Sequence, residues 1–143
     1  MQHCKRVLEY LEQFDFINII DVGAARGALI RELVLPQRKP DSYFALGIDP
    51  LYHNSARYYQ KFLYRAIDNV EKKTFKKFYI SSDDQASSLL KMNYDLLTTD
   101  LNDKERFYVP WADKLYNRLT IFTLVTSLQN VIDKYFNNKV IHF

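Results

Sequence analysis

Several features that are scarce in this sequence exclude whole classes of protein. With Cys4 as its single cysteine, the chain has no internal disulfide and no cysteine-based metal site. The histidines, His3, His53 and His142, lie far apart and lack the spacing of metal ligands. No apolar run approaches the roughly 18 residues of a membrane span, and the amphipathic start is unlike a signal peptide. We therefore expect a cytoplasmic protein with no membrane span and no metal.

Glycine is also scarce, and its positions are informative. The chain has three glycines, Gly23, Gly27 and Gly47, in 143 residues, whereas an average protein has about 7% glycine. All of them fall in one short stretch, near the ends of the first two predicted strands. We therefore expect glycine to be required at two strand-to-helix turns.

The rest of the composition is that of an ordinary globular chain. Hydrophobic residues make up 48% and charged residues 26% of the sequence, which is typical of one folded domain. The formal net charge of +3 is too small to indicate a nucleic-acid partner. A basic stretch at residues 57–77 with interleaved aromatics leaves an RNA patch open, but a solvated charged face is the better interpretation.

Short apolar runs alternate with amphipathic segments along the first half of the chain. Apolar runs predict strands at 16–22, 43–48 and 62–67, and helical spacing predicts helices at 2–13, 28–34 and 55–59. This alternation indicates an α/β fold with a parallel sheet and right-handed crossovers.

The second half is less regular. No period is sustained between residues 81 and 118. The remaining predictions are an added strand or hairpin at 74–80, a strand at 119–126, a helix at 128–136 with Ser127 as its N-cap, and the start of a strand at 139–143.

The most chemically informative segment is D-V-G-A-A-R-G at residues 21–27. It lies between a predicted strand and a predicted helix, which is where open α/β sheets bind ligands. Glycine lets a ligand approach the main chain, and a helix amino terminus presents free N–H groups. Asp49 closes the second strand about 20 positions further on, where an acidic residue accepts hydrogen bonds from ribose hydroxyls. This order of elements predicts a nucleoside site, with a tight turn that binds no ligand as the alternative.

Ala25 bears on which nucleoside this site takes. In the dinucleotide fingerprint G-x-G-x-x-G/A the second glycine admits the pyrophosphate, and Ala25 stands at that position when the motif is read from Gly23. Its methyl group crowds a pyrophosphate, whereas S-adenosylmethionine has an adenosine but no pyrophosphate. The residues therefore favour a methyl donor over a nicotinamide cofactor, without deciding between them.

Several segments in order resemble the FkbM family of class I, Rossmann-like methyltransferases. They are I-I-D-V-G-A-A-R-G at 19–27, F-A-L-G-I-D-P at 44–50, R-A-I-D-N at 65–69, F-Y-I at 78–80, S-S-L at 87–89 and T-S-L-Q-N-V-I at 126–132. In the family they correspond to the first motif, the second strand, the third strand, the hairpin, the S-S-L segment and the helix before the fourth strand. The resemblance implies a partial Rossmann-like parallel sheet with helices on both faces and an added β-hairpin.

The resemblance also implies roles for individual residues. The implied contacts with S-adenosylmethionine come from Asp21, Gly23, Ala24, Ala25, Gly27, Asp49 and Asp68, and those toward the acceptor from Ser87 and Ser88. The glycine turn would surround the methionine part of the donor, and Asp21 would orient that turn and the amino group. Asp49 would hold the ribose hydroxyls, and Asp68 would lie near the adenine. A solvated loop position is the alternative for Asp68 and for the serines.

The sequence departs from the family at two points. Ala25 stands where the family usually has asparagine. The family's next segment, typically L-K-I-D-x-E-G at the methyl-transfer site, should begin where this sequence ends. We therefore expect residues 1–143 to be a single cofactor-binding domain that is incomplete at its C-terminus, with the base that activates the acceptor outside it. The uncovered edge of the strand at 139–143 would then favour self-association.

The function that the resemblance implies is transfer of a methyl group from S-adenosylmethionine to a hydroxyl oxygen. The expected acceptor is a small molecule or glycan, such as a sugar or a secondary metabolite. Two alternatives stay open: a fragment of an NAD(P)-dependent oxidoreductase, and a non-catalytic remnant that binds a cofactor or a protein.

Overall fold

The computed structural model has a mixed α/β fold. It describes residues 6, 9–24, 30–34, 36, 38–51, 53–82, 87–90, 117–137 and 139. The chain divides into a first unit, Met1–Thr74 with Leu124–Phe143, and a second unit, Phe75–Thr123. Each unit is described by itself below.

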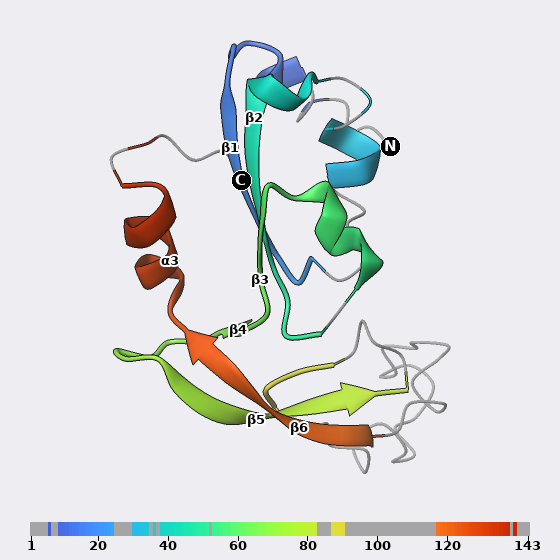
Figure 1. Ribbon diagram of the computed structural model, residues 1–143, viewed down its shortest axis with the longest axis vertical. Coiled ribbons are helices and arrows are strands. Elements are labelled where there is room, and N and C mark those ends of the chain that lie inside the picture. Colours follow the sequence, from blue (N-terminus) through green and yellow to red (C-terminus); the bar gives the residue numbers. More distant parts are fainter. Residues whose placement is uncertain are drawn as a thin grey trace, which may run out of the picture. The chain divides into compact units, whose positions relative to one another are not determined.

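The first unit is built on a small parallel sheet. Its strands are β1 (Ile17–Val22), β2 (Tyr43–Ile48) and β3 (Lys61–Leu63), in the order β1-β2-β3 (Figure 1). β1 pairs with β2 along its whole length, and β3 pairs with the last residues of β2. The strands predicted at 16–22 and 43–48 are confirmed to within one residue, and so is their parallel pairing.

Both faces of this sheet carry buried apolar side chains. Side chains of successive residues along a strand point to opposite faces, and the buried residues form two separate clusters. The first cluster is Ile17, Ile19, Ala24, Ile30, Val34, Tyr43, Ala45 and Tyr59. The second is Ile20, Leu46, Ile48, Leu63, Val131 and Phe136. Continuous apolar runs predict strands of this kind, in which neither face is left to solvent.

Short helical segments supply the partners of these strands. In the predicted helix at 28–34, the described part is a π-helical turn, η1 (Ile30–Val34), which contributes two residues to the first cluster. The predicted helix at 55–59 is a 3-10 helix, η3 (Asn54–Tyr58), and a further 3-10 turn, η2 (Pro40–Ser42), precedes β2. Of the predicted helix at 2–13, residues 6 and 9–11 are described and helical.

Helix α3 (Leu128–Tyr135) packs into the second cluster through Val131. Its predicted N-cap is confirmed, because the Ser127 hydroxyl accepts a hydrogen bond from the Asn130 N–H at 3.2 Å. Phe136, which the prediction included in the helix, is its C-cap and is almost fully buried.

The predicted third strand at 62–67 is wrong as a single element. β3 ends at Leu63, and Ala66–Ile67 form a separate strand, β4, which pairs in parallel with the end of β6 (Asn117–Thr126). The physical reason lies in β2, which ends at Ile48. Asp49 N–H donates to the Leu63 carbonyl at 3.1 Å. The next N–H on that side of the strand belongs to Leu51, and it donates to the Asp49 carboxylate at 2.8 Å instead of continuing the ladder.

The second unit contains β5 (Thr74–Ser81) from Phe75 onward and the first part of β6. Figure 1 draws these strands with their arrows in opposite directions. The predictions of strands at 74–80 and 119–126 are both confirmed. Tyr79 also forms an antiparallel bridge with Ser88, whose N–H and carbonyl both bond to it. Residues 91–116 and the predicted strand residues 140–143 lie outside the described part of the chain.

Candidate functional site

The candidate site lies at the carboxyl edge of the parallel sheet in the first unit. Val22 pairs with Ile48, so the residues that follow them, Gly23 and Asp49, leave neighbouring strands at the same edge. Asp21 is also near this edge, paired with Gly47 in the preceding register position. The structure therefore brings together Asp21, Gly23 and Asp49, which the sequence motifs predicted as one site.

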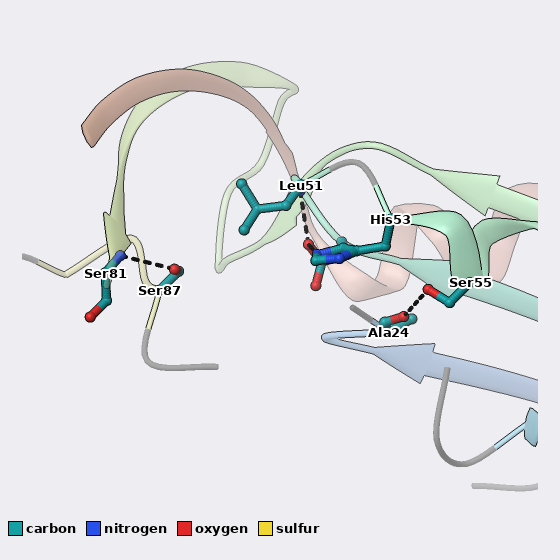
Figure 2. A network of polar contacts seen from close by, with 7 residues as sticks. Ala24, Leu51, His53, Ser55, Ser81 and Ser87 are labelled. Carbon is teal, nitrogen blue, oxygen red and sulfur yellow. Dashed lines mark hydrogen bonds and ion pairs between the residues drawn. The ribbon is translucent and has the colours of Figure 1, made fainter. Parts of the chain in front are cut away.

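The turn after β1 is held by its main chain. Gly23 has φ 80°, a conformation that favours glycine because a side chain there is strained. The N–H groups of Gly23 and Ala24 both donate to the Ile48 carbonyl, at 2.8 and 3.2 Å. On the other side, the buried Ser55 hydroxyl donates to the Ala24 carbonyl at 3.4 Å (Figure 2). β2 and η3 thus position the turn in advance of any ligand.

Asp49 is a buried carboxylate at the end of β2. Its exposed fraction is 6%, and its Oδ1 atom accepts a hydrogen bond from the Leu51 N–H at 2.8 Å. The His53 Nε2 atom lies 3.9 Å from the same oxygen. Burying a charge is costly unless it has polar partners, and acidic residues are almost never fully buried without one. Its burial is thus a second observation in favour of a site here.

Asp21 has a partner that the sequence motifs did not indicate. The Tyr59 hydroxyl donates a hydrogen bond to Asp21 Oδ2, with 2.5 Å between the oxygens. Burial raises the pKa of the Asp21 carboxyl, and the hydrogen bond from Tyr59 partly opposes that rise. Burial and the neighbouring Asp21 together raise the pKa of Tyr59, so this hydroxyl stays protonated and acts as the donor. Tyr59 is the last residue of the helix predicted at 55–59 and directly follows η3 (Asn54–Tyr58), but nothing in the sequence relates it to Asp21.

Asp68 follows the separate strand β4 and not one continuous third strand at 62–67 as predicted. It comes after β4, where its N–H donates to the Thr126 carbonyl at 3.1 Å and its carboxylate accepts from the Asn69 N–H at 2.7 Å. β4 belongs to the sheet that contains β6, not to the β1-β2-β3 sheet. An adenine contact by Asp68 therefore has no support from the sheet register that aligns Gly23 with Asp49.

The predicted acceptor residues Ser87 and Ser88 belong to the second unit. Ser87 Oγ accepts a hydrogen bond from the Ser81 N–H at 3.1 Å (Figure 2), and Ser88 Oγ accepts from the Leu90 N–H at 3.0 Å. Both hydroxyls therefore take part in local turn structure. The remaining predicted residues, Ala25 and Gly27, lie outside the described part of the chain.

Gly47 has a different role from the predicted one. It lies within β2 rather than in a strand-to-helix turn. A Cβ atom at Gly47 would lie 2.7 Å from Phe62 Cδ2 and 3.0 Å from Tyr59 Cδ1. Glycine is needed here because two aromatic rings pack directly against the main chain.

Neither a candidate metal-ligand group nor a candidate membrane-spanning helix occurs among the described residues. No group of three or more histidine, cysteine or acidic residues there could hold a metal ion. No helix within the same ranges has the length and apolar character that a membrane crossing requires.

Comparisons with known proteins identify no relative of this chain. No family model matches the chain, and neither the curated proteins nor the solved structures contain a significant match. The candidate site therefore has to be interpreted from its own residues and from the motifs in the sequence.

Proposed function

We propose that the chain binds S-adenosylmethionine at the carboxyl edge of the β1-β2-β3 sheet and belongs to a methyltransferase that resembles the FkbM family. The observation that carries this proposal is the buried carboxylate of Asp49, placed beside the Gly23 turn by the pairing of Val22 with Ile48. An acidic residue at the end of the second strand, next to a glycine turn after the first, is the arrangement that binds adenosine in open α/β sheets.

The acceptor groups of the site fit this cofactor. Asp49 would accept hydrogen bonds from the ribose hydroxyls, and Asp21 would accept one from the ammonium group of the methionine part. Gly23 itself has no side chain that would obstruct the ligand, and glycine adopts its φ of 80° without strain. None of these contacts requires the pyrophosphate that Ala25 would crowd.

The proposed reaction is methylation of a hydroxyl oxygen on a sugar or secondary metabolite. The bound cofactor would supply a methyl group on a positively charged sulfur. Attack of an acceptor oxygen on the methyl carbon would break the carbon–sulfur bond and release S-adenosylhomocysteine. The contribution of this chain is to bind and orient the donor, since holding reactants in line accounts for much of such catalysis. We place the base that removes the acceptor proton outside the residues described.

The wider fold proposal is a partial Rossmann-like sheet with helices on both of its faces. Two observations support it: the strand order β1-β2-β3 with parallel pairing, and the separation of buried residues into two clusters. One cluster includes residues of η1 and the other includes Val131 of α3.

Calorimetric titration with three ligands tests the proposal. We expect S-adenosylmethionine and S-adenosylhomocysteine to bind more tightly than NAD. Tighter binding of NAD would favour the oxidoreductase alternative, and binding of none of the three would overturn the cofactor site.

A pair of variants locates the binding at Asp49. Asp49→Asn keeps an oxygen for the Leu51 N–H but removes the charge, and we expect it to weaken binding of S-adenosylmethionine by about 1–3 kcal/mol. Asp41→Asn is the matched control, because Asp41 is exposed in η2. Equal affinities for the two variants would remove Asp49 from the site.

A further inference from the structure

Tyr59 is one of the most firmly held side chains near the candidate site. It directly follows η3, its exposed fraction is 7%, and its N–H donates to the Ala56 carbonyl at 3.3 Å. Its ring meets that of Phe62 edge to face, with 5.5 Å between centroids. The bare main chain of Gly47 leaves room for this ring, since a Cβ there would lie 3.0 Å from Tyr59 Cδ1. The position of the hydroxyl is therefore determined by packing.

This hydroxyl donates a hydrogen bond to the carboxylate of Asp21. Asp21 is half-buried at the end of β1, and the Tyr59 hydroxyl lies 2.5 Å from its Oδ2 atom. Hydrogen bonds from a hydroxyl to a carboxylate at this distance are short and strong. A bond to one carboxylate oxygen restricts rotation of the group about its Cβ–Cγ bond, and so determines the direction of the second oxygen, Oδ1.

We propose that Tyr59 is a positioning residue that aims Asp21 Oδ1 at the ammonium group of the methyl donor. This inference rests on the proposed function. Tyr59 does not contact the ligand in this arrangement. It acts through Asp21, and its effect is confined to the amino-acid part of the donor, because the ribose depends on Asp49 at the end of a different strand.

Because the expected effect is limited to the amino-acid part of the donor, a comparison of two ligands distinguishes this role from a purely structural one. S-adenosylhomocysteine and 5′-methylthioadenosine share the adenosine and a neutral thioether sulfur, but only S-adenosylhomocysteine carries the amino-acid part with the same ammonium group as the donor. Calorimetry with both ligands therefore separates the contact with Asp21 from the contacts with ribose and adenine. For Tyr59→Phe we expect about a tenfold loss of affinity for S-adenosylhomocysteine and an unchanged affinity for 5′-methylthioadenosine.

Tyr58→Phe is the matched control. Tyr58 precedes Tyr59 in the chain, and its hydroxyl accepts a hydrogen bond from Arg57 rather than donating to Asp21. We expect this variant to bind both ligands as the wild type does. If Tyr59→Phe weakened binding of both ligands equally, the role of Tyr59 would be structural and the inference would be overturned.

A double-mutant cycle tests whether Tyr59 acts through Asp21. Asp21→Asn removes the charge and should by itself reduce the discrimination between the two ligands. Adding Tyr59→Phe to it should then cause no further loss, because interacting residues have non-additive effects. Additive losses would overturn the inference while leaving the cofactor site intact. If the wild type bound neither ligand, the proposed function would fail, and the inference with it.

Discussion

The strands of the two units bury their apolar residues to different extents. In the first unit, Ile17 to Ile20 of β1 are all buried, and Leu46 in β2 has no exposed surface. In the second unit, Phe75 of β5 and Phe122 of β6 are each 68% exposed. β6 itself spans both situations, because Val125 and Thr126 are fully buried where they pair with β4. Apolar content therefore predicts a strand, but the elements packed against it determine burial.

The largest expected effect comes from truncating one buried and one exposed apolar side chain. Leu46→Ala should destabilise the protein by about 2–5 kcal/mol, because it leaves a cavity in the second cluster. Phe122→Ala should change the free energy of unfolding by no more than about 0.5 kcal/mol, since its ring is already largely in solvent. Urea unfolding followed by circular dichroism measures both. Equal losses would show that the contrast in burial has no energetic consequence.

A smaller effect is expected from filling the space at Gly47. Gly47→Ala should cost about 1–3 kcal/mol, because the new methyl group overlaps the Phe62 ring. Adding Phe62→Leu should recover part of this loss by making the ring smaller. The same urea titrations test the pair, and a double variant no more stable than Gly47→Ala would contradict the packing explanation.

The N-cap of α3 should contribute less again. Ser127→Ala removes the acceptor for the Asn130 N–H and should cost about 1 kcal/mol. Ser127→Asp keeps an acceptor oxygen and should be close to wild type. Thermal melts of the three proteins provide the comparison, and a melting temperature for Ser127→Ala equal to that of the wild type would argue against a stabilising cap.

The smallest effect is a pH-dependent one at Asp21. Burial raises the pKa of its carboxyl above the ordinary value of 3.8, so the folded state binds this proton more tightly than the unfolded state. The resulting stabilisation is present below pH 3.8 and is lost as the pH rises through the raised pKa. Relative to Asp21→Asn, the wild type should therefore become less stable over that window. Unfolding titrations at several pH values test the sign, and a relative gain for the wild type with rising pH would contradict it.

Local patterns were sufficient to predict much of the first unit. Apolar runs located β1 and β2, and the alternation of elements predicted their parallel pairing. Because parallel strands end at one edge of a sheet, the positions of Asp21, Gly23 and Asp49 in the sequence already implied that they lie together. The N-cap at Ser127 also depends only on residues within one helical turn.

Other features depended on contacts between residues that are distant in the sequence. The break between β3 and β4 arises because β2 ends before Pro50 and β6 supplies a new partner for Ala66 and Ile67. Tyr59 reaches Asp21 only because the rings of Tyr59 and Phe62 pack over Gly47. A linear pattern records periodicity and local hydrogen-bonding capacity, so it defines strands, turns and caps. Which strand pairs with which, and which hydroxyl meets which carboxylate, depends on packing that forms only when the chain folds.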